Sequence, residues 1–487
     1  MNRVWNTPHT ADTRTFDPRD VFEAGLRNHH VSNTAYPLAH EITWAPYRVP
    51  PPRVQATAAR AWDGIEDLCL YVHVPFCETR CSFCEYTVVG REEIPAMQPY
   101  VDDLLREFDL HSDGLGPAPR RFHGFDLGGG TPAYLHAEDI ARIVEKARAM
   151  FQFTPTSDIS IETTPKIAAA EPRKLAAYRR LGIDRISMGL QVIQADLLKI
   201  LNRSENGADR HRLAVDNIRK AGFRRLNVDL MYGLAGQSLG EDGWRATLQH
   251  AIDLEPDYIT LYRMRYKLTR ISHQATHVTL DHVRPMIRLA KAMLAGAGFH
   301  AIPGKTTYSR IPDDVGTSSY LARRVIDGMP YVGLGLGAQS FTHTTISYND
   351  GGVGKNLLPY RRSIAADRLP LQDLYDLPAR QMMGKMCAVS FYFGEIDRAA
   401  FQAKFGVGLE RVFADEVEFV LRRGLMEWTP RSLRLTADGA LNVNGVIALF
   451  FAPSLQQYLI DRDPDRGDDL DRHRLRAEKV AGEMARV

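Results

Sequence analysis

The chain is poor in cysteine, has no long apolar run and carries no excess of either charge. Its 487 residues include only five cysteines. No apolar run approaches about 18 residues, which excludes a membrane-spanning helix, and the N-terminal segment lacks the apolar core of a signal peptide. Lys and Arg (61) nearly balance Asp and Glu (59), which argues against a general nucleic-acid partner. We expect a cytoplasmic protein, because few cysteines and no export signal indicate a reducing compartment.

Three of the five cysteines lie in one short loop. Cys77, Cys81 and Cys84 have the spacing C-x3-C-x2-C and follow the apolar run Leu68–Val74. Three thiolates at this spacing can ligate three corners of an iron–sulfur cluster. Because no fourth cysteine lies nearby, one iron would keep an open position, which marks a reactive site. The expected occupant of that position is a small chelating molecule.

Two other interpretations of this loop are weaker. A zinc knuckle needs a fourth Cys or His close by, and the nearest histidine downstream is His111. A disulfide pair with a spare thiol is typical of secreted proteins. The remaining cysteines, Cys69 and Cys387, lie in apolar stretches and are expected to be buried.

From about residue 66, short apolar runs alternate with amphipathic stretches, which predicts an α/β fold with a parallel sheet. Six strand–helix units are fewer than the eight of a closed barrel, so we expect a partial (β/α)6 barrel. In barrels of this kind the chemistry lies at the carboxyl ends of the strands. The expected strands are Leu68–Val74, Phe122–Leu127, Ile159–Glu162, Arg185–Leu190, Leu226–Met231 and Tyr258–Tyr262.

Polar or glycine-rich groups stand at the ends of these strands. The turn 128–131 (Gly-Gly-Gly-Thr) lets the backbone approach a ligand closely, and Glu162, Gln191 and Asp229 end or nearly end the next three strands. Singly, each is weak evidence, because most glycine-rich turns are only turns and a strand-end acid is often a surface residue. Together they predict one polar rim, at which a carboxylate could bind an ammonium or ribose hydroxyls.

Further along, the segment RMRYK contains Arg263, Arg265 and Lys267. If the strand continues, these alternate residues share one face and could bind a carboxylate-bearing substrate; a solvated strand edge is the alternative. The segments 300–303 and 331–341 are expected to be further buried strands. Glycines at 333, 335 and 337 would leave one strand face without side chains.

Composition suggests four segments. We expect an extended N-terminal arm (1–60), the partial barrel with its extension (61–368), a small helical, winged-helix-like domain (369–460) and a charged tail (461–487). Within the third segment, GLMEWTPRSLRLT is predicted to form a two-stranded wing. The helix before this wing is not markedly basic, so we interpret the domain as a structural cap rather than a DNA reader.

Several segments together match the pattern of a known family. They are YVHVPFCETRCSFC, FDLGGGTPAYL, ISIETTP, RISMGLQVIQADLLKILNR, LNVDLMYGLAGQS and the C-terminal region ending in ALFF. The first resembles the signature of the radical S-adenosylmethionine superfamily. The wider pattern, from Tyr71 to Phe451, resembles the oxygen-independent coproporphyrinogen III oxidase-like branch, which includes a subgroup of class C methyltransferases.

The resemblance implies a [4Fe–4S] cluster on Cys77, Cys81 and Cys84, with S-adenosylmethionine chelating the open iron. Reduction of the cluster would cleave S-adenosylmethionine to a 5′-deoxyadenosyl radical. By matching position, the resemblance also implies a second S-adenosylmethionine close to Met231 and Gln339. The residues expected to line the first cofactor site are Tyr71, Phe83, Gly129, Gly130, Thr131, Glu162, Gln191, Arg203 and Asp229.

The chain also departs from that branch. After the last cluster cysteine, Glu85 and Tyr86 stand where the coproporphyrinogen enzymes have Gly-Cys, and YRMRYKL replaces their Asn-Tyr-Ala-His pattern. We therefore expect retained radical chemistry and an altered substrate pocket, with Tyr86, Arg263 and Arg265 contacting the substrate. The predicted reaction is methylation of an sp2 carbon, or addition of a methylene to it, with a second S-adenosylmethionine as carbon donor.

Two alternatives remain open. One is oxidative decarboxylation of the propionates of coproporphyrinogen, and the other is a haem-trafficking protein of the same fold. The expected partners are a small-molecule substrate, carboxylate-bearing, and a reducing flavodoxin- or ferredoxin-type electron donor, with no nucleic acid and no membrane. We expect the protein to be a monomer.

Overall fold

The computed structural model describes residues 13–462 except 116–119, 267–268, 313 and 315. No helix within these residues is both long enough and apolar enough to cross a membrane. The charged tail expected over 461–487 lies almost entirely outside the described residues.

All six expected strands are present, and together they form the parallel part of one large sheet. Each is longer than expected by one to three residues, and neighbours pair in parallel in the order given below. The predicted partial barrel of the α/β class is therefore confirmed. The six strands are β1 (Asp67–Val74), β2 (Arg121–Gly129), β4 (Ile159–Thr163), β5 (Arg185–Gln191), β6 (Arg225–Tyr232) and β7 (Tyr258–Arg263).

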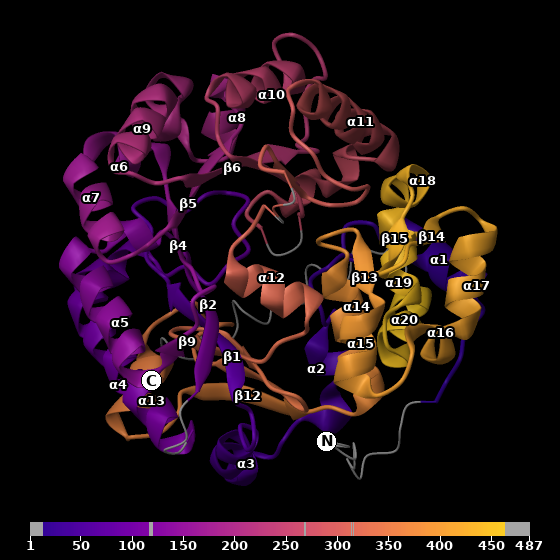
Figure 1. Ribbon diagram of the computed structural model, residues 1–487, viewed down its shortest axis with the longest axis horizontal. Helices are drawn as coiled ribbons and strands as arrows, with labels where there is room; N and C mark the ends of the chain where they lie inside the picture. The colour runs from indigo at the N-terminus through magenta and orange to yellow at the C-terminus, as the bar shows by residue number, and fades with distance from the viewer. Residues whose placement is uncertain (1–12, 116–119, 267–268, 313, 315, 463–487) are drawn as a thin grey trace.

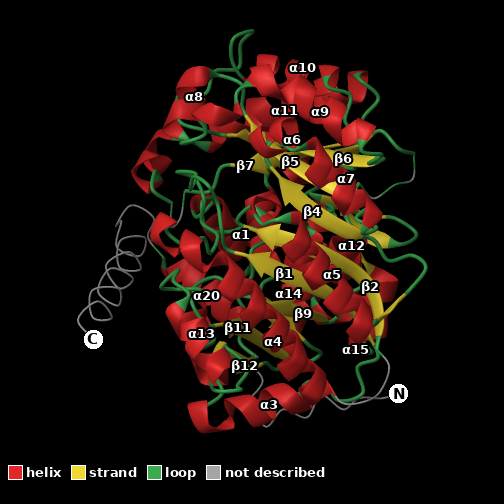
Figure 2. Ribbon diagram, turned by 90° about the vertical axis from the view of Figure 1, so that its left-hand side faces the viewer, coloured by secondary structure: helices red, strands yellow, loops and turns green. Residues whose placement is uncertain are grey.

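Helices cover the outer face of these strands (Figures 1 and 2). In Ala137–Met150 (α5), for example, Ile140, Ile143, Val144 and Ala147 are buried, which is the i, i+3, i+4, i+7 spacing of one helix face. The other helices between the strands are α4 (Met97–Leu115), α6 (Pro165–Ala170), α7 (Pro172–Arg180), α8 (Ala195–Ile200), α9 (Ala208–Lys220), α10 (Trp244–Asp253) and α11 (Leu280–Gly296).

One helix, α12 (Ser319–Ile326), lies near the centre of the view in Figure 1 and packs on β1 and β2. Ser318 caps its N-terminus and also donates a hydrogen bond to Asp126 on β2 (Oγ–Oδ2, 2.8 Å). The contact is close because β2 has a glycine there: a Cβ on Gly124 would lie 2.1 Å from the backbone nitrogen of Tyr320. This helix therefore blocks one side of the barrel interior.

Six more strands belong to the same sheet. Short strands β8 (Thr307–Ser309) and β3 (Gln152–Phe153) pair with β7 and β2. Beyond β1, the sheet continues through β9 (Tyr331–Leu334), β10 (Gln339–Phe341), β11 (Thr345–Asn349) and β12 (Leu371–Asp376). Since β12 pairs with β11, the residues just after the boundary expected at 368 still belong to the large sheet. The helix α13 (Leu358–Ala365) lies between β11 and β12 in the sequence.

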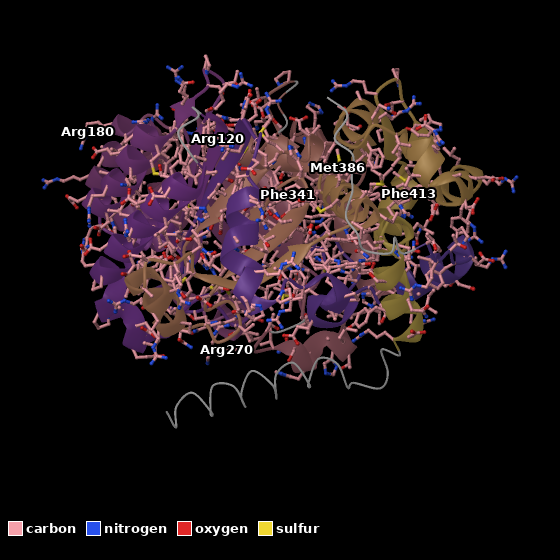
Figure 3. The ribbon with its side chains drawn as sticks, turned by 90° about the horizontal axis from the view of Figure 1, so that it is seen from below. Arg120, Arg180, Arg270, Phe341, Met386 and Phe413 are labelled. Atoms are coloured by element: carbon pink, nitrogen blue, oxygen red, sulfur yellow. The ribbon has the colours of Figure 1, made fainter. Side chains whose placement is uncertain are left out.

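The C-terminal part packs around a second hydrophobic core, in which Phe341, Met386 and Phe413 lie (Figure 3). Strands β14 (Met426–Trp428) and β15 (Ser432–Leu435) form the expected ribbon, and β13 (Glu395–Asp397) adds a third strand. The helices are α14 (Ala379–Ser390), α15 (Arg398–Phe405), α16 (Leu409–Val412), α17 (Ala414–Arg422), α18 (Ala437–Leu441), α19 (Val443–Leu449) and α20 (Pro453–Asp461).

The N-terminal segment is less extended than its composition predicts. Residues 13–60 contain α1 (Pro18–Arg27), α2 (His40–Thr43) and α3 (Val54–Arg60). Helix α1 packs against α19, α17 and α20, and its Val21 and Phe22 join the second core. The missed signal was the apolar spacing of α1, whose buried face is formed by residues 21, 22, 24 and 25.

The glycine-rich segment 331–341 is not one strand, as predicted, but a hairpin of β9 and β10. Gly335 and Gly337 have φ values of 96° and 64°, a region that glycine adopts without steric cost. These glycines therefore form a turn instead of a bare strand face. The segment 300–303 is also not a strand; only His300 makes an isolated bridge, to Ser309.

The strand β7 ends at Arg263, so the prediction that the three cations of RMRYK share one strand face is wrong for Arg265. Lys267 lies outside the described residues. Both Cys69 and Cys387 are buried, as expected.

A buried carboxylate joins α4 to the far side of the sheet. Glu107 accepts hydrogen bonds from the backbone N–H of Gly335 (2.8 Å), the amide of Asn349 (2.6 Å) and the hydroxyl of Tyr360 (2.7 Å). Burial raises the pKa of Glu107 to about 7. Three segments distant in sequence thus depend on one acceptor group.

Replacing this acceptor is expected to destabilise the fold. Glu107→Ala should lower the free energy of unfolding by about 3 to 5 kcal/mol, because three buried donors lose their partner. Urea denaturation at pH 8 measures the change. The matched control is Glu145→Ala, an exposed carboxylate on α5, which should stay within about 0.5 kcal/mol of wild type; equal losses for the two variants would contradict the assignment.

Candidate active site

The loop that follows β1 places its three cysteines on one cavity. Cys77, Cys81 and Cys84 are free thiols of intermediate exposure, and all three line a cavity of about 520 Å³ at the carboxyl ends of the parallel strands. Figure 3 shows on which side of the molecule the cysteine loop lies. Arg270, whose backbone N–H donates to the carbonyl of Ser82 in this loop (3.0 Å), lies at the lower edge of the molecule. Arg120, just before β2 begins, lies toward the opposite side.

Contacts from several distant segments fix this loop. The N–H of Ser82 donates to the carbonyl of Leu201 (3.0 Å), and Asn202 donates through Nδ2 to the carbonyl of Arg80 (2.8 Å). Lys355 donates through Nζ to the carbonyls of residues 85 and 86 (3.2 and 2.9 Å). The positions of the cysteines are therefore set by the whole barrel rather than by the loop alone.

The thiols have neighbours that favour their charged form. Arg203 lies with Nη1 3.2 Å from Sγ of Cys81, and the hydroxyl of Thr131 lies 3.4 Å from Sγ of Cys77. Burial nevertheless raises the pKa of Cys77 to about 12 and also raises that of Cys84. Stable thiolates here need a further positive charge, which a metal centre supplies.

The donor set fits a cluster of several metal ions better than a single ion. Among the described residues, no three His, Cys, Asp or Glu side chains converge closely enough to hold one metal ion. An iron–sulfur cluster binds each cysteine through a different iron, so its three thiolates need not meet at one point. Three separated thiolates around one cavity suit that arrangement.

Glycines bring the end of β2 against the cysteine loop. The N–H of Gly130 donates to the carbonyl of Val74 (2.7 Å), and that of Thr131 donates to the carbonyl of Phe76 (2.8 Å). A Cβ on Gly129, which has a φ of 113°, would lie 2.6 Å from the ring of His73. Only glycine fits there, so the turn 128–131 does more than reverse the chain.

Two carboxylates line the cavity from the ends of β4 and β6, Glu162 exposed and Asp229 half-buried. Desolvation by the surrounding cavity walls raises the pKa of Glu162 to about 8, and the nearby Asp229 raises it further. Burial also raises the pKa of Asp229, which accepts hydrogen bonds from Ser187 (3.0 Å) and Asn227 (2.7 Å). Within the part of the chain that the structure describes, no side chain donates a hydrogen bond to Glu162, which is therefore the group more available to a ligand.

Among the described residues, polar atoms beside these carboxylates have no hydrogen-bond partner and are free to bind a ligand. Gln191, at the end of β5, has a left-handed backbone (φ 68°), and its buried Oε1 has no hydrogen-bond partner. Arg203 donates to the carbonyl of Gly189 (2.6 Å), while its Nε is buried and unpaired. Strain and unpaired groups of this kind are costly unless a ligand uses them. The residues present therefore fit a polar cofactor such as S-adenosylmethionine beside a cluster.

Most of the site residues predicted from sequence lie on this one cavity, although their roles stay predictions. Tyr71 and Gln339 are the exceptions: neither lines it, and Gln339 instead accepts hydrogen bonds from Tyr331 and from Lys385 (Nζ–Oε1, 3.3 Å). The lining includes the three cysteines with Phe83, Tyr86, Gly129, Gly130, Thr131, Glu162, Gln191, Arg203, Asp229, Met231, Arg263 and Arg265.

A second cavity, of about 460 Å³, adjoins the first. Residues 262–265 and Tyr86 line both cavities. The second cavity continues between β7, residues 301–308, the C-terminal domain and the end of α1. Sequence reasoning missed most of its lining, including Lys305 and Tyr392, because these residues carry no motif and come together only in the fold.

Comparison with known proteins agrees with this geometry. Residues 71–243 match the model of the radical SAM superfamily, where SAM is S-adenosylmethionine. The chain is 33% identical over 196 residues to the heme chaperone HemW of Buchnera aphidicola subsp. Schizaphis graminum, covering 40% of this chain and 50% of that protein. It is 29% identical over 377 residues to the oxygen-independent coproporphyrinogen III oxidase of Cereibacter sphaeroides, covering 73% and 79%. The chain thus spans about half the length of its haem chaperone relatives.

The fold resembles that of a solved relative, coproporphyrinogen III oxidase (HemN) from Escherichia coli, described as a radical SAM enzyme. The TM-score is 0.70 at 23% sequence identity, and the match covers 86% of this chain and 96% of the other. At this identity the likeness supports the fold alone.

Metal loading should depend on the loop cysteines and not on the buried ones. Cys81→Ala is expected to lose most of the iron, and the absorbance near 400 nm, after anaerobic reconstitution, because one of three thiolate ligands is missing. Cys69→Ala is the matched control, because this thiol is fully buried and does not line the cavity. Full iron content in Cys81→Ala would contradict the cluster site.

The family match and the cysteine cavity at the strand ends point to the same conclusion. Residues 71–243 match the radical S-adenosylmethionine superfamily, and the longer alignment shows that the chain is similar to oxygen-independent coproporphyrinogen III oxidases.

Proposed function

We propose that this protein is a radical S-adenosylmethionine enzyme that oxidatively decarboxylates a carboxylate-bearing substrate, with coproporphyrinogen III as the first candidate. The observation that carries the proposal is the second cavity, which shares a wall with the cofactor cavity and contains cations without acidic partners. The names of the relatives support the same reaction, since several are oxygen-independent coproporphyrinogen III oxidases.

The charges of the second cavity favour a carboxylate. Arg263 contacts only neutral partners among the described residues, namely His29 and Asn444 (Nη1–Oδ1, 2.9 Å). Lys305 lies over the ring of Phe393 (5.7 Å) and forms no ion pair within the described chain. Asp438 is the one acid that lines the cavity. A cation buried without a counter-ion is costly, so an anionic ligand would be stabilised here.

The rest of the cavity suits a large, mostly apolar ligand. Its lining includes Tyr232, Tyr262, Tyr308, Phe391 and Tyr392, and aromatic rings of this kind bury flat apolar surface well. Arg288 and Lys291 stand on exposed positions at the same cavity. A flat molecule with carboxylates at its edge fits both pairs of cations: Arg263 and Lys305 within the cavity, and Arg288 and Lys291 at its exposed side.

A substrate in the second cavity would lie next to a cofactor in the first, because the two cavities share a wall. When bound and reduced, the cluster with S-adenosylmethionine supplies a carbon radical that removes one hydrogen atom from the substrate. If that atom leaves the carbon β to a carboxylate, the carboxylate departs as CO2, one electron passes to a one-electron acceptor and a C=C bond remains. The protein contributes position and exclusion of water, through Tyr86 and the residues 262–265.

The methyl or methylene transfer expected from the sequence receives no support from the relatives, and we do not favour it. The haem-trafficking alternative has support in the HemW relatives, but their similarity covers only about 40% of the chain. Four oxidase relatives in contrast extend over 73 to 81% of it, although a fifth covers 41%.

Binding of S-adenosylmethionine should depend on pH through Glu162. The pKa of Glu162 is raised to about 8, and only the ionised carboxylate pairs well with an ammonium or ribose hydroxyls. The affinity should therefore fall by up to about tenfold for each pH unit below 8 and level off above it. Anaerobic equilibrium dialysis of wild type and Glu162→Gln checks this, since the variant should show only the pH dependence of the ligand itself. Identical profiles would contradict the role of Glu162.

The proposed reaction is tested with coproporphyrinogen III under anaerobic conditions. Wild type should release CO2 and form 5′-deoxyadenosine in equal amounts. Arg263→Met should lower kcat/KM by at least about tenfold, because an ionic hydrogen bond to the substrate is lost, while 5′-deoxyadenosine formed without substrate stays unchanged. Arg288→Met, at the exposed side of the cavity, should have a smaller effect. Tight haem binding without CO2 release would favour the haem chaperone instead.

A further inference from the structure

Arg265 lies in the wall between the two cavities, and its guanidinium already pairs with a carboxylate of the protein itself. Its Nη2 donates to Oε1 of Glu85, which follows the last cysteine of the loop, and its Nη1 donates to Oδ1 of Asn33 (3.1 Å). Arg265 lines both cavities, whereas Glu85 lines only the first. The ion pair therefore reaches across the wall, from the substrate side to the cluster loop.

The pair is accessible enough to exchange partners. The side chains of Arg265 and Glu85 keep 33% and 25% of their surface exposed. A released Glu85 would meet a cation in the first cavity, because Arg80 lines it and the buried Nε of Arg80 has no hydrogen-bond partner. Exchange of one carboxylate for another at Arg265 would keep every charge paired, which avoids the cost of an unpaired buried cation.

The exchange would change the surroundings of the cluster cysteines. Glu85 is bonded to Cys84 through one peptide, and Lys355 holds the carbonyls of residues 85 and 86. With the backbone held by Lys355, the side chain of Glu85 can turn while the chain path is kept. A ligand in the second cavity thereby changes the charge and the contacts beside the last cluster cysteine.

We propose that Glu85 is an intramolecular stand-in for a substrate carboxylate: the substrate displaces it from Arg265, and the displacement reports occupancy of the substrate cavity to the cluster loop. This inference rests on the proposed function, because it assumes that a carboxylate ligand enters the second cavity. The ligand and Glu85 compete for Arg265. By thermodynamic linkage, a substitution that weakens the contact between Glu85 and Arg265 must therefore strengthen binding of the ligand. Glu85 is thus a positioning residue rather than a catalytic one.

The test uses the anaerobically reconstituted protein and the fluorescent tetracarboxylate coproporphyrin III as probe. Glu85→Gln should bind the probe about tenfold more tightly than wild type, because the internal competitor is weakened. In an Arg265→Met background the same change should have no effect. The matched control is Glu92→Gln, an exposed carboxylate near the loop, which should bind as wild type does.

Hydrogen exchange of the peptide 77–89 gives a second measurement that needs no turnover. The probe should speed exchange in this peptide of wild type, while Glu85→Gln should exchange at the faster rate with or without probe. Equal probe affinity of Glu85→Gln and wild type, or exchange that the probe leaves unchanged, would overturn the inference. If the affinity changes as expected but no CO2 is released from coproporphyrinogen III, the proposed reaction fails while the displacement of Glu85 stands.

Discussion

The whole site depends on the parallel alignment of β1, β2, β4, β5, β6 and β7. Because these strands run in one direction, the residues that follow their last positions meet at one rim. The cysteine loop, the turn 128–131, Glu162, Gln191 and Asp229 come from five different strands and still line a single cavity. No short segment of the chain could build this cavity, since each strand contributes one or two groups only.

The same rim concentrates charged groups. Glu162 and Asp229 both have raised pKa values, because the cavity walls desolvate their ionised forms. In the same cavity, Nη1 of Arg203 lies 3.2 Å from Sγ of Cys81. Perturbed carboxylates and a cation in one cavity are typical of functional sites. The electrostatics thus support the same location as the cysteine spacing, by an independent argument.

The parts of the fold that the sequence predicts well are those that local patterns determine. The six strands are short apolar runs between amphipathic stretches, and the spacing of the cysteines by itself indicates which three residues are the cluster ligands. The sequence predicts a strand at Gly335 and Gly337, where the structure has a turn. Alternating glycines are compatible with both, and only their φ values distinguish the turn from the strand. Tyr71 and Gln339 do not line the cavity, although they match a family pattern.

The second cavity was beyond sequence reasoning for a different reason. Its lining joins residues 29–34, 301–308 and 391–447 to the end of β7, and no periodicity relates positions so far apart. Likewise, the ion pair of Arg265 with Glu85 depends on the exact turn of the chain after β7 ends. Such contacts follow from tertiary packing, which single-residue patterns do not encode.

The origin of the second cavity's lining has an evolutionary consequence. Apart from β7, Tyr86 and Tyr232, its walls come from the segment before the barrel, the segments after β7 and the C-terminal domain, whereas the cluster loop and the other strand ends belong to the barrel. The two sets of residues can therefore drift at different rates. A descendant of this chain could acquire a new ligand by exchanging its peripheral segments, while inheriting the radical-generating half unaltered.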